Sequence, residues 1–126
     1  MSRKQTLVLI VEDDVFVAMD AVDSVSGAGI EALTAESVTD AIGILEREEI
    51  SAAILDFHVR DGIVTPLIER LRERHIPYRV VTGSPVAELL EKGVPLNLCA
   101  PKPADYRAIV GTLVPIGSAS SPSAPR

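Results

Sequence analysis

The sequence predicts one α/β domain, in which a parallel β-sheet carries helices on both of its faces. Three observations support this prediction. The 126 residues are enough for a single domain, and 47% of them are hydrophobic. Short apolar runs alternate with amphipathic helical patterns along the chain. Aromatic residues contribute only 3%, so the core must consist mainly of Val, Ile, Leu and Ala, which suits helices packed closely on a sheet.

Five short apolar runs are predicted to be strands covered on both faces, as the strands of a parallel sheet are. They span residues 7–11, 30–35, 52–55, 78–82 and 96–100. Pro101 follows the last run directly and cannot donate to a ladder of hydrogen bonds. We therefore expect the last run to be an edge strand.

A helical pattern follows each of the strands. The first helix is predicted to bury an apolar stripe made of Val15, Ala18, Met19, Val22 and Val25. Gly27 ends this helix, and Ser37 or Thr39 can cap the next one. The later helices are expected around residues 41–45, 66–71, 86–91 and 105–113. The helix over 86–91 is short and weakly patterned.

Strands that alternate with helices imply right-handed crossovers and a parallel sheet. At this size the expected architecture is the flavodoxin-like doubly wound sheet with five strands in the order 2-1-3-4-5. This domain should occupy residues 6–114. Residues 115–126 are rich in Ser, Pro and Ala, cannot bury enough apolar surface to offset their conformational entropy, and are predicted to be a disordered tail.

Composition excludes several classes of protein. Cys99 is the single cysteine, so neither an internal disulfide nor a zinc framework is predicted. The chain shows no signal peptide and no apolar run long enough to cross a bilayer, so we expect a cytoplasmic protein without a membrane role. The net charge of −6 opposes binding to nucleic acid and favours proteins or cations as partners.

Polar side chains follow four of the predicted strands at their carboxyl ends, which meet at one edge of a parallel sheet and form its ligand site. These residues are Glu12-Asp13-Asp14, Asp56, Thr82-Gly83-Ser84 and Lys102-Pro103. Carboxylates on adjacent strands would repel by about 4 kcal/mol per pair at about 4 Å and an effective dielectric constant of about 20. A divalent cation would neutralise them, and Mg²⁺ suits an acidic cluster without histidine side-chain ligands.

This group of residues predicts phosphoryl chemistry. Asp56 lies at its centre and can act as a carboxylate nucleophile that forms an aspartyl phosphate. Lys102 would supply a fixed positive charge and Thr82 a hydroxyl donor, so that catalysis comes from positioning and electrostatics. We assign Asp14 to capping the first helix, which is the commoner role of an acidic residue at that position.

The motifs Val11-Glu12-Asp13-Asp14, Leu55-Asp56, Val81-Thr82-Gly83 and Lys102-Pro103, in this order and spacing, closely resemble the receiver domains of bacterial two-component response regulators. The resemblance implies that Asp56 accepts a phosphoryl group from a sensor kinase histidine. It also implies that Glu12, Asp13, Asp56 and the His58 backbone carbonyl organise Mg²⁺, and that Thr82 and Lys102 hold the phosphoryl group. Lys102-Pro103 is expected to be a cis peptide bond.

Residues 76–83 are similar to a subgroup of single-domain receivers with a Pro-aromatic-x-x-x-Thr-Gly fourth strand, known from alphaproteobacterial signalling. Three features depart from the family. Cys99 replaces an aromatic residue often found three positions before the lysine, Pro101 precedes Lys102, and the fourth helix is poorly formed. These departures concern the route by which the signal leaves the site.

The sequence thus predicts a signalling phosphoacceptor rather than an enzyme, with no chemistry beyond its own phosphorylation and dephosphorylation. Expected partners are a sensor histidine kinase or histidine phosphotransfer protein and a downstream protein. A haloacid dehalogenase-type phosphotransferase would need a second acid where this chain has His58, and a nucleotide-binding domain would need a Gly-rich turn after the first strand. The alternative left open is a receiver-like interaction module that works without phosphorylation.

Overall fold

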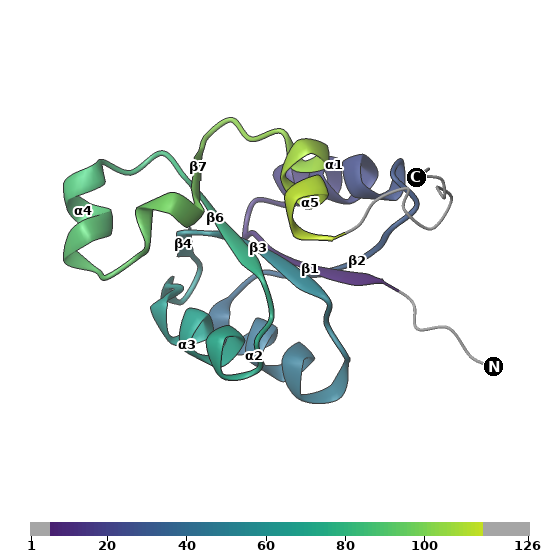
Figure 1. Ribbon diagram of the computed structural model, residues 1–126, viewed down its shortest axis with the longest axis horizontal. Helices are drawn as coiled ribbons and strands as arrows, with labels where there is room; N and C mark the ends of the chain where they lie inside the picture. Colours follow the sequence, from purple (N-terminus) through teal and green to yellow (C-terminus); the bar gives the residue numbers. More distant parts are fainter. Residues whose placement is uncertain (1–5, 115–126) are drawn as a thin grey trace, which may run out of the picture.

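The central sheet has five parallel strands in the order β2-β1-β3-β6-β7, with β2 and β7 as its edge strands (Figure 1). The strands are β1 Leu7–Val11, β2 Glu31–Ala35, β3 Ala52–Asp56, β6 Tyr78–Thr82 and β7 Cys99–Pro101. This order confirms the predicted flavodoxin-like topology. The computed structural model describes residues 6–114, so the predicted tail over 115–126 lies outside the described residues.

Two layers of helices cover the sheet (Figure 1). The bounds are α1 Val15–Ser26, α2 Val38–Arg47, α3 Thr65–Glu73, α4 Val86–Glu91 and α5 Tyr106–Leu113. Helices α1 and α5 lie together on one face, and α2 and α3 lie together on the other. Within residues 6–114, no helix is long and apolar enough to cross a membrane.

Alternate residues of β1 pack into apolar clusters on the two opposite faces of the sheet. Val8 and Ile10 pack into the cluster beneath α1 and α5, whereas Leu9 and Val11 pack into the cluster beneath α2 and α3. Because side chains alternate along a strand, a continuous apolar run fills both cores at once. Helix α4 contributes a single buried residue, Leu89, to the second cluster.

The predicted apolar stripe of α1 is confirmed in part. Ala18 and Val25 are buried and Val22 packs against the cluster beneath α1 and α5, whereas Val15 and Met19 are 59% and 58% exposed. The third buried residue of the helix is Ala21, which the predicted stripe did not include. Apolar residues occur on several sides of this helix, so periodicity alone does not define its buried face.

The segment predicted as a strand over 96–100 is largely not a strand. Residues Leu96–Leu98 form a 3₁₀ turn, in which the Leu98 amide donates to the Pro95 carbonyl, and only Cys99–Pro101 pair with β6. Strand β7 is an edge strand, as expected from Pro101.

The polar loop that follows β3 forms a small antiparallel hairpin of β4 His58–Val59 and β5 Gly62–Ile63. Gly62, the first residue of β5 after the turn, has φ = +128°, a backbone conformation that favours glycine. The hairpin is tied to α2, because the Asp61 carboxylate accepts hydrogen bonds from the amides of Val38 and Thr39.

Candidate phosphoacceptor site

Three carboxylates meet at the carboxyl end of the sheet. Glu12 and Asp13 follow β1, Asp56 ends β3, and one carboxylate oxygen of each lies within 4.8 Å of the others. The registers Val11 to Leu55 and Val11 to Ala35 place β1 between its neighbours, so the residues that follow β1 and β3 emerge side by side. The sequence analysis therefore placed these acids together correctly.

Glu12 is almost completely buried, with 3% exposure. Its amide extends the β1–β2 ladder by donating to the Ala35 carbonyl at 2.9 Å, and its Oε2 accepts from the Asp14 amide at 3.0 Å. Its Oε1 is buried and has no hydrogen-bond partner in the part of the chain that the structure describes. Burial is the main cause that raises the pKa of Glu12 to about 7. The Asp56 charge raises this pKa further, whereas the Asp14 amide and Lys102 lower it.

Asp14 has the role in helix capping that the sequence suggested. Its Oδ1 accepts hydrogen bonds from the amides of Phe16 and Val17 at 2.9 and 3.2 Å, and its backbone is extended just before α1. The carboxylate thus satisfies amides that the first turn of a helix leaves free. Asp13 therefore contributes its carboxylate to the acidic cluster, whereas Asp14 caps α1.

Lys102 brings a positive charge to the acidic cluster. Its Nζ lies 3.1 Å from Asp56 Oδ1 and 3.9 Å from Glu12 Oε1. The Lys102 amide donates to the Thr82 carbonyl, which aligns the end of β7 with the end of β6. The Lys102-Pro103 bond is cis, as the sequence comparison implied.

Thr82 ends β6 beside β3, in the register that pairs Asp56 with Val81. Its side chain is buried, and its Oγ1 accepts a hydrogen bond from the Ser84 amide at 2.8 Å. The hydroxyl proton is left available for another acceptor. Thr82 thus lies at the carboxyl ends of the strands, as the acids do. Its hydrogen bond with Ser84 joins the site to the segment that leads into α4.

His58 lies on β4, two residues after Asp56, and its imidazole turns toward α4. Its Nε2 lies 3.1 Å from Glu88 Oε2, and its ring contacts Phe57 edge-on with the centroids 4.7 Å apart. No observation bears on its backbone carbonyl as a metal ligand, so that role stays a prediction. The sequence did not indicate Glu88 as a partner of His58, because Glu88 lies 30 residues further along the chain in a weakly patterned helix.

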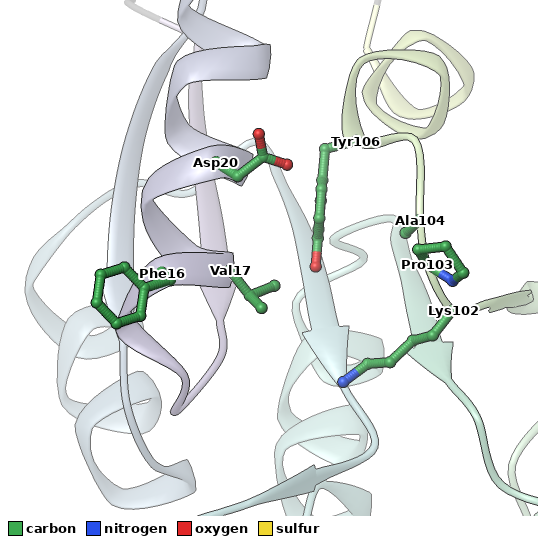
Figure 2. A pocket seen from close by; sticks show the side chains of 7 residues that line it. All are labelled: Phe16, Val17, Asp20, Lys102, Pro103, Ala104 and Tyr106. Carbon is green, nitrogen blue, oxygen red and sulfur yellow. The ribbon is translucent and has the colours of Figure 1, made fainter.

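A cavity of about 490 Å³ opens beside Lys102 between α1 and the start of α5 (Figure 2). Phe16, Val17, Asp20, Lys102, Pro103, Ala104 and Tyr106 line it. The sequence analysis missed Asp20 and Tyr106 as neighbours of the site. The available signal was an aromatic residue four positions after Lys102 in a chain with two tyrosines and two phenylalanines.

The acidic cluster has the chemistry of a site for a hard divalent cation. It offers oxygen ligands only, and two of its three carboxylates are buried. Among residues 6–114, Lys102 is the one cation that forms an ion pair with the cluster, so an excess of negative charge remains. In the described part of the chain, Glu12 Oε1 accepts no hydrogen bond, and Lys102 Nζ lies 3.9 Å from it. Magnesium is typically held by one or two carboxylates together with waters and phosphate oxygens, so these residues fit it.

Several solved structures with the same fold are receiver domains of response regulators. The response regulator receiver domain protein (CheY-like) of Methanospirillum hungatei JF-1 superposes with a TM-score of 0.73 at 23% identity, covering 86% of this chain and 90% of that one. The chain has the response-regulator receiver fold. No protein-family model and no curated protein matches this sequence.

Two further receiver structures come from PhyR proteins, which are alphaproteobacterial. The REC domain of Erythrobacter litoralis PhyR is 24% identical, with a TM-score of 0.73 over 95% of this chain and 96% of that one. PhyR of Brucella abortus is 25% identical, with a TM-score of 0.73 over 94% of this chain and 51% of that one. Both come from alphaproteobacteria, as do the receivers that residues 76–83 resemble, and membership of the single-domain subgroup stays a prediction. At these identities the likeness shows the receiver fold.

Proposed function

We propose that this protein is a phosphoacceptor receiver domain of a bacterial two-component or phosphorelay system that works in the cytoplasm. The observation that carries the proposal is the pairing of Asp56 with Lys102 at 3.1 Å inside a buried acidic cluster, at the ligand-binding edge of a receiver fold. Fold alone does not define a function, so the argument rests on this constellation of residues. Its phosphodonor is a phosphohistidine of a sensor kinase or a histidine phosphotransfer protein.

Mg²⁺ would be held by the carboxylates of Glu12, Asp13 and Asp56 and by the His58 backbone carbonyl. When bound, the cation would withdraw charge from the phosphoryl group and screen the repulsion between that group and the carboxylates. The residues themselves provide the alignment. β1 and β3 are adjacent strands, each paired with a strand on both sides, so the carboxylates follow the interior of the sheet rather than its edges.

In the transfer, a carboxylate oxygen of Asp56 forms a bond to phosphorus while the nitrogen–phosphorus bond of the phosphohistidine breaks. The departing imidazole keeps the electron pair of that bond and takes up a proton. No general base is needed, because the attacking Asp56 carboxylate carries no proton. Lys102 remains beside the Asp56 carboxyl and meets the new phosphoryl charge. The Thr82 hydroxyl donates to a phosphoryl oxygen, which makes its position sensitive to phosphorylation.

Incubation with acetyl phosphate and Mg²⁺, followed by intact-mass measurement, tests the proposal. The expected result is the gain of one phosphoryl group that depends on the cation and on Asp56. A receiver-like module that binds its partner without phosphorylation would gain no mass under these conditions. Phosphotransfer from a phosphorylated histidine kinase would then show that a protein donor uses the same carboxylate.

A further inference from the structure

Strand β2 has an outer edge without a paired strand. Within residues 6–114 it pairs with β1 alone, in an uninterrupted register. The Ala35 carbonyl faces β1, where it accepts from the Glu12 amide. Because successive residues direct their backbone groups to opposite sides of a strand, those of Ala32 and Thr34 face outward. Edge strands are commonly protected from further pairing by Pro, Lys or a short length. β7 is short and contains Pro101, whereas β2 is longer, contains neither Pro nor Lys, and can accept another strand.

Helix α1 places exposed apolar side chains beside this edge. Val15, Met19 and Val22 lie at positions i, i+4 and i+7 and therefore share one side of the helix. Together with Thr34 of β2 they line a cavity of about 240 Å³. Val15 and Met19 are more than half exposed, so their burial against an apolar partner would be favourable. The α1 side of the edge thus offers an apolar contact surface.

Helix α2 presents opposite charges on the other side of the same edge. Asp40, Gly43 and Arg47 line a second cavity, of about 350 Å³, which also reaches Thr34. Asp40 and Arg47 are exposed, lie two helical turns apart on one side of α2, and form no ion pair within the described residues.

Gly43 lies between these two charges. Beyond the helix backbone itself, a methyl group added at Gly43 would contact only the end of the Arg47 side chain, at 3.5 Å. Glycine weakens a helix relative to alanine, and the packing of this chain does not require it at this position. Gly43 is therefore suited to the close approach of another backbone.

We propose that the β2 edge and the flanking sides of α1 and α2 bind a second copy of this chain. The two β2 strands would pair antiparallel about a two-fold axis that passes Leu33, so that Ala32 of each copy lies opposite Thr34 of the other. The two sheets would then form one continuous sheet. The inference goes beyond the function proposed above, because this contact requires neither Mg²⁺ nor phosphorylation.

The surface on the two sides of the edge is complementary to itself. A two-fold axis perpendicular to the sheet keeps each helix on its own face and sets it antiparallel to its copy. The apolar stripes of the two α1 helices would then meet, and Asp40 of each copy would approach Arg47 of the other. Gly43 is near the middle of α2, where the two α2 helices would cross. An identical chain therefore satisfies both the apolar and the charged features, and each contact occurs twice.

The spacing of the elements allows the strands and the helices to make contact together. Helices α1 and α2 each pack over β1 and β2, on opposite faces of the sheet (Figure 1). Helices that lie over the same pair of strands in two copies would be separated by about two strand spacings, or about 10 Å. Packed helices are separated by about 8–10 Å. Pairing of the β2 strands would therefore bring the helices within contact distance on both faces.

Sedimentation equilibrium of the full chain, without Mg²⁺ or a phosphodonor, tests the association. The average mass should rise from that of one chain toward that of two as the protein concentration increases from micromolar to millimolar. Met19→Glu should raise the dissociation constant of the dimer about 10-fold or more, because it places a charge in the apolar contact. Leu90→Glu, a matched change at an equally exposed position of α4, should leave it unchanged. A monomer at every concentration overturns the proposal, and so does a dimer that Leu90→Glu dissociates and Met19→Glu does not.

A charge exchange on α2 tests the arrangement of the two copies. Arg47→Asp should weaken the dimer about 10-fold, because it sets an acid of each copy beside Asp40 of the other. Adding Asp40→Arg to this variant should restore the wild-type dissociation constant. Since Asp40 and Arg47 of one chain form no ion pair with each other, such a rescue reports a contact between copies. A folded double variant that associates as weakly as Arg47→Asp would show that the α2 helices do not meet, and the proposed dimer would be wrong.

Amide hydrogen exchange locates the contact on β2. Exchange at Ala32 and Thr34, whose amides face outward, should slow as the protein concentration rises, whereas the Leu33 amide faces β1 and should exchange slowly throughout. Fast exchange at Ala32 and Thr34 in the dimer would place the contact elsewhere and refute the proposal. Slow exchange at these two amides that does not depend on concentration would assign the edge to another segment of the same chain, and a second copy would then be the wrong occupant.

Discussion

Lys102 Nζ lies 3.1 Å from Asp56 Oδ1, so the proposed phosphoacceptor is paired with a cation before any phosphate arrives. This pairing offsets part of the repulsion among Glu12, Asp13 and Asp56 while leaving the cluster with net negative charge. The site therefore has a fixed positive charge in place and a remaining preference for a further cation.

Asp56→Asn should abolish phosphorylation by acetyl phosphate, because it removes the nucleophile. The free energy of unfolding should rise by about 1 kcal/mol, because Asn removes the repulsion between Asp56 and the two other carboxylates, and this gain exceeds the loss of the ion pair with Lys102. Intact mass and urea unfolding measure the two effects. A mutant that still gains one phosphoryl group with Mg²⁺ would show that another residue is the acceptor.

Asp13→Ala and Asp14→Ala should have different consequences despite their adjacency. Asp13→Ala should weaken Mg²⁺ binding and slow phosphorylation, because it removes an oxygen from the acidic cluster. Asp14→Ala should have a smaller effect on both but lower the free energy of unfolding by about 1 kcal/mol, because it removes the cap of α1. Equal losses of Mg²⁺ affinity in a titration of the two variants would contradict this division.

Glu12 should make the folded protein less stable as the pH rises. Its pKa is raised to about 7 in the folded state from an ordinary value of 4.5, so between these values the folded state binds more protons than the unfolded state. The free energy of unfolding therefore falls across this interval, by about 3 kcal/mol, and Mg²⁺ should restore it at high pH. Urea unfolding of the wild type and Glu12→Gln measures the difference. Parallel pH profiles of the two proteins would contradict the prediction.

The sequence predicted the acidic site because the relevant information is local to each strand end. Once the apolar runs are taken as parallel strands, residues that follow them must meet at one edge, so Glu12, Asp56, Thr82 and Lys102 needed no knowledge of side-chain contacts. The strand order followed from the size of the domain and the alternation of strands and helices. The fold and the principal site residues were thus accessible without the structure.

Other features depended on tertiary packing and left no signal in the sequence. The buried face of α1 was predicted only in part because its apolar residues fit more than one face, and only contact with the sheet distinguishes buried Ala21 from exposed Met19. The pairing of His58 with Glu88 and the capping of α2 by Asp61 join residues far apart in the chain. Periodicity describes one element at a time and cannot find such contacts.

The segment over residues 83–95 is predicted to be the element that changes on phosphorylation. Two contacts join it to the site: the Ser84 amide donates to Thr82 Oγ1 at 2.8 Å, and Glu88 Oε2 lies 3.1 Å from His58 Nε2. Helix α4 has one buried residue and no side-chain cap at its start, as expected for a segment of low local stability. A shift of Thr82 toward a phosphoryl group would therefore disturb the turn that leads into α4.

Backbone NMR with Mg²⁺, before and after addition of beryllium fluoride as a phosphoryl mimic, measures this response. Beyond the site itself, the largest shifts are expected over 83–95, because Cys99 is too small to act as the aromatic relay found on the last strand of many receivers. Glu88→Gln should reduce the shifts in α4 by weakening the contact with His58, whereas Glu91→Gln removes an equal charge from the same helix and should not. Shifts confined to Leu98–Ala100 and α5, with 83–95 unmoved, would contradict the prediction and assign the output to the α5 side of the domain.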